Sequence, residues 1–334
     1  MAALYITSSQ VGAGKTLVCA GLGRHLKGKG KKVGFFKPLV AAIKSKEADS
    51  DTAFIKHVLS LKEPVDDLCP VIGGEVKLAG KVKQAYARVA KGKDVVIIEG
   101  VWQQRPGGKS VESSYEIARA LEAKVIVVEG YSPDLFKTKL ADKYQGFGAD
   151  LLGVVINKVP MSRMEAVREL GGMEVLGVIP EDRTLLGLTV AELAELAEGK
   201  VVNDTGKSME LVENYMLGAL SVDSGLGYFG RKDNKAVVVK GERPDMQLAA
   251  LETSTKCLVI SGDGSPIYDV LHSAEGKGIP VIVTDEDTAS VMDSVEQALG
   301  MTKFNQEKKL PRLAEIMKQR FDFKALYKGL GLAA

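Results

Sequence analysis

Three consecutive residues near the start of the chain, Gly14, Lys15 and Thr16, have the clearest chemical use. They end the segment Ile6–Thr16, I-T-S-S-Q-V-G-A-G-K-T, which follows an apolar stretch and precedes a helical pattern. Backbone N–H groups of a glycine loop and of a helix N-terminus carry partial positive charge and converge on an anion. The lysine adds a full charge for the β/γ-phosphates, and the threonine hydroxyl can reach magnesium. This order of strand, loop and helix predicts a phosphate-binding P-loop.

The loop departs from the usual G-x-x-x-x-G-K-[ST] pattern, because Ser9 stands at the first glycine position. Two glycines, Gly12 and Gly14, lie two residues apart instead. This spacing is similar to that of the deviant P-loops of the MinD and dethiobiotin synthetase group, although Gln10 stands where many of those proteins carry a second lysine. The predicted nucleotide-binding residues of this segment are Gly12, Ala13, Gly14, Lys15, Thr16 and Leu17.

Charged residues follow the next predicted strands. Glu99 ends the apolar run 94–99, Lys37 follows another strand, and Asp51 follows a loop. The carboxyl ends of parallel strands meet at one crevice, and Mg²⁺ usually takes one or two carboxylates together with phosphate oxygens and water. We therefore expect a magnesium site on Thr16, Asp51 and Glu99, with Lys37 facing it. The alternatives are that Glu99 is a surface-turn acid, that Asp51 is a plain helix cap and that Lys37 is a solvated lysine.

Two further strands end in polar residues. Asn157 and Lys158 close the strand over 151–156, where the amide can hydrogen-bond a purine edge and the lysine stem can cover its face; an ordinary turn asparagine is the alternative. Glu129 ends another buried strand. It could bind a cationic group, position water or pair with a lysine such as Lys37.

Apolar runs alternate with helical patterns along the chain, which predicts an α/β fold with a parallel sheet. A second α/β unit begins after the junction at 199–207, and a mixed-charge amphipathic helix is predicted over 305–326. We expect a P-loop NTPase domain over 1–200, a smaller α/β domain over 207–300 and a C-terminal helical extension over 301–334.

Composition restricts the class of protein. The 334 residues carry a formal net charge of +2, so no polyanion such as nucleic acid is implied as a partner. The three cysteines form no C-x-x-C pair. Neither a signal peptide nor an apolar run of about 18 residues is present. We expect a cytoplasmic protein without a membrane partner.

Several motifs occur in a family-specific order over residues 1 to about 198: G-K-T at 14–16, F-K-P at 36–38, Asp51, I-E-G at 98–100, I-N-K at 156–158 and G-V-I-P at 177–180. This order resembles dethiobiotin synthetase and, more closely, the dethiobiotin-synthetase-like N-terminal domain of long bacterial phosphate acetyltransferases. The resemblance implies that ATP lies on the P-loop, with magnesium on the three residues given above. It also implies that Lys15 and Lys37 are catalytic, that Asn157 takes the base, and that the protein is a homodimer.

The segment 208 to about 300 resembles the DRTGG domain, found in nucleotide-sensing proteins. Its hallmark region reads K-G-E-R-P-D-M over 240–246, between a strand and a helix. Backbone N–H groups near Gly241 and the Arg243 guanidinium could hold an anion there. A capped turn with a solvent-paired arginine is the alternative. In the long acetyltransferases the acetyltransferase domain would follow, whereas this sequence ends at Ala334, so we expect no acetyl transfer from these residues.

The residues expected to contact the substrate differ from those of dethiobiotin synthetase, whereas the residues expected to contact the nucleotide are the same. Val11, Gly12 and Ala41 replace a hydroxyl residue, an acid and a serine, and the loop over 101–110 replaces a glycine-rich segment. We therefore expect a nucleotide-sensing accessory or regulatory protein with slow ATP hydrolysis, acting on a partner such as a metabolic enzyme. The alternative is an ATP-dependent ligase or carboxylase that phosphorylates a carboxylate or carbamate. An anion pocket in the 101–110 loop would favour the enzyme.

Overall fold

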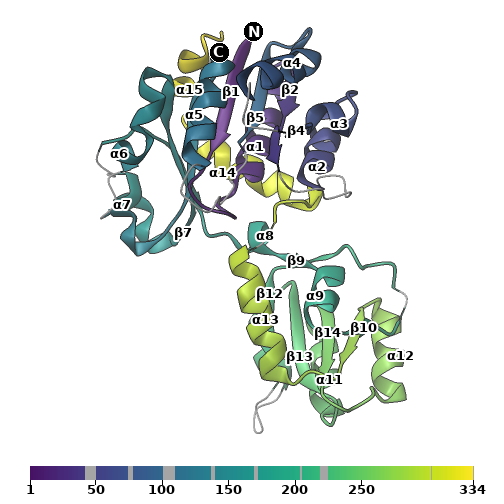
Figure 1. Cartoon of the computed structure of the whole chain (residues 1–334). Helices are drawn as coiled ribbons and strands as arrows, with labels where there is room; N and C mark the ends of the chain where they lie inside the picture. Colours follow the sequence, from purple (N-terminus) through teal and green to yellow (C-terminus); the bar gives the residue numbers. More distant parts are fainter. Residues whose placement is uncertain are drawn as a thin grey trace. The chain divides into compact units, whose positions relative to one another are not determined.

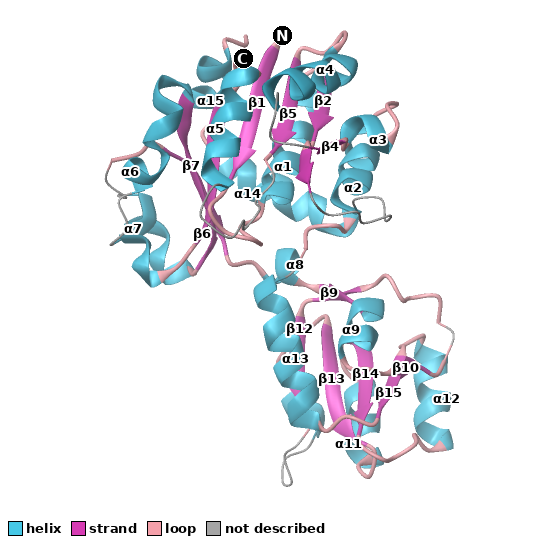
Figure 2. Ribbon diagram, viewed as in Figure 1, coloured by secondary structure: helices cyan, strands magenta, loops and turns pink. Residues whose placement is uncertain are grey.

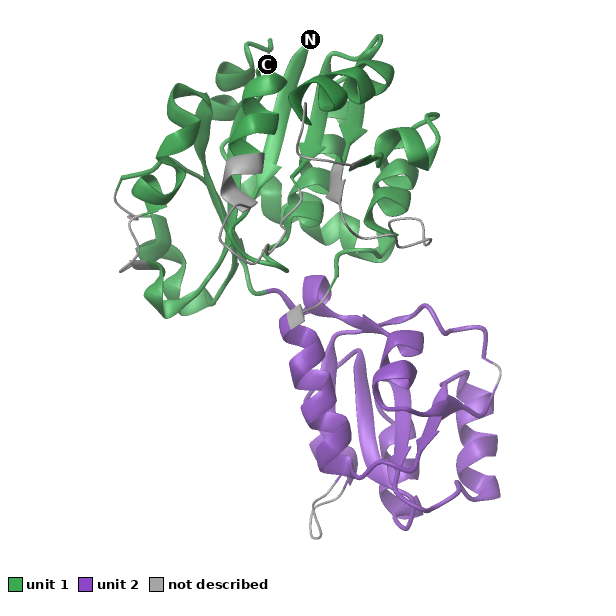
Figure 3. Ribbon diagram, viewed as in Figure 1, with its two compact units in different colours: residues 1–181, 303–334 green, residues 182–302 purple. Residues whose placement is uncertain are grey.

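The computed structural model describes residues 1–41, 50–73, 78–100, 110–136, 140–168, 172–203, 205–218, 225–301 and 303–333. The chain folds into two compact units (Figure 1, Figure 3). The first unit contains residues 1–181 and 303–334, and the second contains residues 182–302. Each unit has its own sheet. Among the described residues, no helix combines the length and the apolar character needed to cross a membrane.

The first unit is built on a six-stranded sheet with the order β2-β5-β1-β6-β7-β8, in which every neighbouring pair is parallel. Its strands carry buried apolar side chains on both faces, as expected for a parallel sheet that is covered by helices. The strands are β1 (Ala2–Thr7), β2 (Val33–Phe36), β5 (Val95–Glu99), β6 (Lys124–Gly130), β7 (Leu151–Val159) and β8 (Val175–Pro180). A separate parallel pair joins β3 (Leu39–Ala41) to β4 (Val71–Gly73).

Helices cover both faces of this sheet (Figure 2). One face carries α1 (Lys15–Gly28), which packs against α2 (Ser50–Leu59), and the other carries α4 (Leu78–Ala90) and α5 (Ser110–Ala120), which contact each other. The shorter helices are α3 (Val65–Leu68), α6 (Leu140–Tyr144) and α7 (Met164–Arg168). The predicted parallel α/β P-loop architecture is confirmed.

The C-terminal segment returns to the first unit. Helix α14 (Leu310–Arg320) packs against α1, and α15 (Phe323–Leu330) packs against β1, β7 and β8. The predicted single helix over 305–326 was wrong. Phe321 has extended backbone and bridges Gly177, and the Asp322 side chain then caps a new helix by accepting from the Ala325 N–H at 2.9 Å.

The second unit has a five-stranded sheet with the order β10-β15-β14-β13-β12. Its last four strands are parallel and β10 is antiparallel to β15. The strands are β10 (Lys200–Val201), β12 (Asn214–Leu217), β13 (Lys235–Lys240), β14 (Thr255–Ser261) and β15 (Val281–Thr284). The helices are α8 (Arg183–Leu186), α9 (Val190–Leu196), α10 (Gly225–Phe229), α11 (Pro244–Leu251), α12 (Tyr268–Lys277) and α13 (Thr288–Met301).

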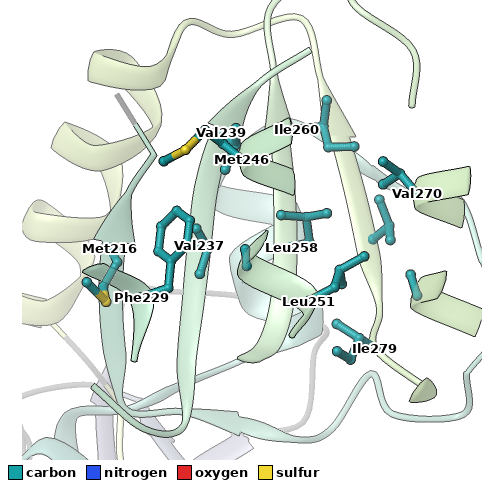
Figure 4. Close-up of a cluster of buried hydrophobic side chains, with 13 residues drawn as sticks. Met216, Phe229, Val237, Val239, Met246, Leu251, Leu258, Ile260, Val270 and Ile279 are labelled. Atoms are coloured by element: carbon teal, nitrogen blue, oxygen red, sulfur yellow. The ribbon is translucent and has the colours of Figure 1, made fainter. Parts of the chain in front are cut away.

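Two apolar layers hold the second unit together. On one face, side chains of α10, α11 and α12 pack on the sheet around Phe229, Val237 and Leu258 (Figure 4). On the other face, α9 and α13 pack on alternate residues of the same strands, such as Val238 and Val259. Alternation along the strands therefore places two helical layers on one sheet.

The units divide earlier than the sequence analysis placed them. Residues 182–200 were assigned to the P-loop domain, but the two-residue strand β9 (Leu188–Thr189) pairs with β11 (Leu211–Val212), and α9 packs on the second sheet. The predicted junction at 199–207 therefore lies inside the second unit. The predicted extension over 301–334 belongs, from residue 303 onward, to the first unit.

Candidate nucleotide-binding site

The P-loop follows the central strand of the first sheet. Strand β1 pairs with β5 on one side and with β6 on the other, so the strand order changes direction there. Ligands of open parallel sheets bind beyond the carboxyl ends of the strands at such a switch point. The turn after Thr7 leads into α1, whose first residue is Lys15. The loop therefore lies where the fold brings several strand ends together.

Two glycines shape the loop. Gly12 has φ 71° and Gly14, the N-cap of α1, has φ 103°, values that residues with a side chain rarely adopt. A Cβ at Gly14 would lie 2.1 Å from Asn157 Nδ2, whereas a Cβ at Gly12 would meet no atom within 4 Å. Gly14 is therefore needed for both its backbone angle and its close contact. The first N–H groups of α1 (Lys15, Thr16 and Leu17) have no acceptors one turn earlier inside the helix, so they can face an anion.

Lys15 begins α1 beside the loop. Its Nζ donates to Ser8 Oγ at 2.9 Å, so the side chain folds back over the P-loop. Burial lowers the pKa of Lys15, and the nearby Glu99 carboxylate opposes that shift. Burial disfavours the charged ammonium, and the negative charge of a bound phosphate would stabilise it.

Thr16 and Glu99 lie side by side. The Thr16 hydroxyl donates to Glu99 Oε1 at 3.1 Å, and Glu99 is only 3% exposed at the end of β5. Burial raises the pKa of Glu99, and Lys37 opposes the rise. Its second oxygen, Oε2, is buried and has no hydrogen-bond partner among the described residues. A buried carboxylate with an unsatisfied oxygen next to a hydroxyl fits the oxygen ligands of Mg²⁺.

Lys37 connects the two predicted metal-binding acids. Its Nζ lies 2.9 Å from Asp51 Oδ2 and 3.5 Å from Glu99 Oε1, and the residue is 7% exposed. The described parts of the chain contain no group of three or more His, Cys, Asp or Glu residues able to hold a metal. A magnesium ion here would therefore depend on Glu99, Asp51 and Thr16 together with phosphate oxygens. Lys37 is placed to balance the acids.

Glu129 accepts hydrogen bonds from the P-loop, where pairing with a lysine was one of the expected alternatives. At the end of β6 it is 1% exposed; its Oε2 accepts from Ser9 Oγ at 3.0 Å and its Oε1 accepts from the Ser9 N–H at 3.3 Å. The Tyr144 hydroxyl also donates to Oε1, and burial raises the pKa of this tyrosine. Ser9 occupies the position where the common pattern has glycine, so its side chain is used as an anchor. Sequence reasoning singled out Ser9 and Glu129 separately but missed their pairing and Tyr144, for which the sequence carries no signal.

Asn157 lies against the P-loop. Its Nδ2 donates to Ala13 O at 2.9 Å, and it is 3% exposed. Lys158, the next residue, has φ 57° and is half-buried, and burial lowers its pKa. The structure thus brings together seven predicted site residues around the carboxyl ends of β1, β2, β5 and β7: Gly14, Lys15, Thr16, Lys37, Asp51, Glu99 and Asn157. Of the loop over 101–110, proposed as a test for an enzyme, residues 101–109 lie outside the described residues.

The second unit does not place Arg243 as an anion ligand. Its guanidinium makes two hydrogen bonds to the Asp245 carboxylate, at 2.9 and 2.8 Å, on the surface. Gly241 instead lines a pocket of about 460 Å³ at the carboxyl ends of β13 and β14. The pair with Asp245 favours the alternative of a paired arginine for Arg243, and the anion site expected on Gly241 and Arg243 stays a prediction.

Comparisons with known proteins identify the two domains. Residues 2–187 match the AAA domain family and residues 192–298 match the DRTGG domain. The phosphate acetyltransferase of Pseudomonas aeruginosa is 26% identical over 99% of this chain and 52% of that enzyme. The ATP-dependent dethiobiotin synthetase of Bacillus subtilis strain 168 is 26% identical over 58% of this chain and 94% of that enzyme.

The chain spans about half the length of the phosphate acetyltransferases it matches. A solved structure of the CBS and DRTGG domains of a Clostridium perfringens pyrophosphatase covers 36% of this chain and 49% of that chain, with 16% identity and a TM-score of 0.30. The two domain matches confirm the order predicted from the sequence, a dethiobiotin-synthetase-like P-loop domain followed by a DRTGG domain.

Proposed function

Since this chain belongs to the AAA domain family, we propose that its P-loop binds ATP as the magnesium complex and that the chain is a nucleotide-sensing accessory or regulatory protein with slow ATP hydrolysis. One observation carries the proposal: at the N-terminus of α1, which begins at Lys15, the Thr16 hydroxyl donates to Glu99 Oε1 at 3.1 Å. Lys15 supplies charge for the β/γ-phosphates, and the Thr16 hydroxyl with Glu99 supplies oxygen ligands for Mg²⁺. The two domain matches support the broader class, a nucleotide-binding regulatory or ATP-using protein.

The base side of the site would be formed by Asn157 and Lys158. Because Asn157 Nδ2 already donates to Ala13 O, its Oδ1 is the atom we assign to accept from an adenine amino group. The same hydrogen bond would connect base recognition to the shape of the P-loop. We propose that the half-buried stem of Lys158 lies along the base.

A regulatory role is favoured over a ligase by the environment of Lys37. In a ligase this lysine would be shared between the γ-phosphate and a carboxylate substrate. Here its ammonium lies between Asp51 and Glu99, so its charge is balanced before any substrate enters. Binding energy for an anionic second substrate is reduced accordingly.

A ligase-type activity is kept as the alternative because Lys37 lies 3.5 Å from the acid proposed to hold magnesium. Phosphoryl transfer requires mainly positioning and neutralisation of charge, which Lys15 and Lys37 could provide. The proposal further includes a homodimer in the cytoplasm and a metabolic enzyme as the regulated partner, by analogy with the matched families.

The test is phosphate release from MgATP by the wild type and by Lys15→Ala, with and without bicarbonate or small carboxylates. Slow release that depends on Lys15 and ignores every added acid is the expected result. Phosphate release that rises steeply with one added acid would favour the ligase function over the sensor function. Absence of any Lys15-dependent binding or release would overturn both.

A further inference from the structure

The pocket that Gly241 lines in the second unit is built from three loops that follow neighbouring parallel strands. These loops come after β13, β14 and β15, and the pocket has a volume of about 460 Å³. Small-molecule sites commonly have volumes of about 300–1,000 Å³, and the carboxyl ends of parallel strands are where such sites occur. The cavity therefore has the size and position of a binding site separate from the P-loop.

The loops around this pocket are held rigidly. A Cβ at Gly241 would lie 2.4 Å from the Cα of Gly264, so the first two loops approach as closely as glycine allows. The buried Gln247 donates its Nε2 to Lys240 O at 2.8 Å and to Gly241 O at 3.2 Å. The Ser261 and Thr288 hydroxyls are 2.8 Å apart, which ties the β14 end to the start of α13. The pocket is thus pre-formed.

Several of the backbone donors that an anion would need are already used. The N–H groups of Gly241, Gly262 and Gly264 donate to the carbonyls of Ser261, Glu286 and Gly262, respectively. At the N-terminus of α13, the N–H groups of Ala289 and Ser290 both donate to Asp287 Oδ1. Phosphate recognition by loops and helix ends depends on such groups being available. The glycine turns and the start of α13 therefore offer a bare phosphate fewer donors than a phosphate-binding loop does.

The charge of the pocket lining also disfavours an anionic ligand. Three carboxylates (Glu242, Asp263 and Asp287) face one ammonium, that of Lys240. In the part of the chain that is described, these acids do not form a group able to hold a metal ion. An acceptor-rich pocket that suits neither an anion nor a bare cation suits a neutral ligand with several hydroxyl donors.

Asp263 is the acceptor best placed for such a ligand. Asp287 already caps α13, and Glu242 lies 3.9 Å from the Lys240 ammonium. Among the described residues, the Asp263 side chain has no hydrogen bond or ion pair, and Asp263 is the second residue after the end of β14. In dinucleotide-binding folds, an acid about 20 residues after the glycine of the first strand–helix turn, beyond the end of the second strand, binds the ribose hydroxyls. Asp263 stands in this place relative to Gly241.

We propose that this pocket binds a nucleoside through its ribose, with the Asp263 carboxylate accepting hydrogen bonds from the 2′- and 3′-hydroxyls. The Ser261 and Thr288 hydroxyls line the same pocket. The inference deepens the proposed sensing role by giving the DRTGG domain a ligand class and a contact residue, and it does not use the P-loop. Because the lining is acidic, a 5′-phosphate adds no affinity.

The experiment is calorimetric titration of the full chain with adenosine, 2′,3′-dideoxyadenosine and AMP. Hydrogen bonds to a charged group are worth about 1.5–3 kcal/mol, or roughly tenfold or more in affinity. We expect adenosine to bind, the dideoxy compound to bind about tenfold or more weakly, and AMP to bind no more tightly than adenosine. Guanosine and its dideoxy form test the other purine base.

Variants assign the site. Asp263→Asn should weaken adenosine binding about tenfold or more, whereas Asp269→Asn, in the exposed first turn of α12 outside the pocket lining, should leave it unchanged. Thermal unfolding of both variants controls for folding. The inference is overturned if neither purine nucleoside binds, if the dideoxy compound binds equally well, or if Asp263→Asn has no effect. Lys15-dependent ATP binding, measured on the same samples, reports separately on the P-loop proposal.

Discussion

Replacing Gly14 by alanine tests the shape of the P-loop. The residue has φ 103°, and its new Cβ would lie 2.1 Å from Asn157 Nδ2. A left-handed conformation costs a residue with a side chain about 1–2 kcal/mol. Displacing the amide removes its hydrogen bond to Ala13 O, worth about 1 kcal/mol. Gly14→Ala should therefore lower the free energy of unfolding by about 2–3 kcal/mol.

Two matched variants separate these effects. Gly12→Ala has a similar backbone problem, with φ 71°, but its Cβ meets no atom within 4 Å, so only about 1–2 kcal/mol should be lost. Asn157→Ala removes the side chain that the new Cβ would strike. In that background Gly14→Ala should cost about as much as Gly12→Ala, giving a favourable coupling of about 1 kcal/mol.

The assay is urea unfolding of the three single variants and the Gly14→Ala/Asn157→Ala double variant, with MgATP affinity measured alongside. Gly14→Ala should weaken binding more than Gly12→Ala does, because the displaced Asn157 no longer supports the loop. Equal losses at the two glycines, combined with no coupling between positions 14 and 157, would refute the proposed contact.

Three further predictions concern the rest of the first unit. Glu129→Gln weakens the charged anchor of the P-loop and should reduce MgATP affinity about fivefold in calorimetry, whereas Glu122→Gln, at an exposed position, should not; equal affinities would exclude the anchor. Burial raises the pKa of Glu99 in the folded state above its ordinary value of 4.5. The contribution of Glu99 to the free energy of unfolding is therefore complete below pH 4.5 and is lost as pH rises through the folded-state pKa. The wild type should gain stability relative to Glu99→Gln as pH falls from 7 to 5 in urea titrations, and a constant difference would contradict this. Leu313→Ala, at a fully buried position of α14 beside α1, should cost about 2–5 kcal/mol of unfolding free energy, and Glu315→Ala, on the exposed face, less than about 0.5 kcal/mol; similar losses would show that the C-terminal helix does not stabilise the unit.

The P-loop could be predicted because its elements are local in sequence. An apolar strand, a glycine turn and Gly-Lys-Thr before a helix specify the backbone within residues 3–22. The acid at the end of β5 could also be placed, since a buried parallel strand delivers its last residue to the crevice. The Lys37 ion pairs could not be predicted in detail, because their geometry depends on how α2 packs beside β2.

Other features depend on contacts between distant segments. Glu129 and Ser9 are 120 positions apart, and neither residue type specifies the other. The break at Phe321 depends on its bridge to Gly177. Arg243 differs, because Asp245 lies two residues away in the sequence, and that spacing was a local signal for the ion pair that occupies the guanidinium. The assignment of residues 182–200 to the first domain failed because the pairing of β9 with β11 is invisible in apolar periodicity.

The central claim is that Lys15 at the start of α1 binds the phosphates of MgATP. The most direct measurement is calorimetric titration of MgATP into the wild type, Lys15→Ala and Lys29→Ala, the last at the opposite, exposed end of the same helix. Charge-assisted contacts to phosphate are the strong ones, so we expect Lys15→Ala to lose about tenfold or more in affinity and Lys29→Ala to match the wild type. Equal MgATP affinities for all three proteins, or no binding to any, would contradict the account.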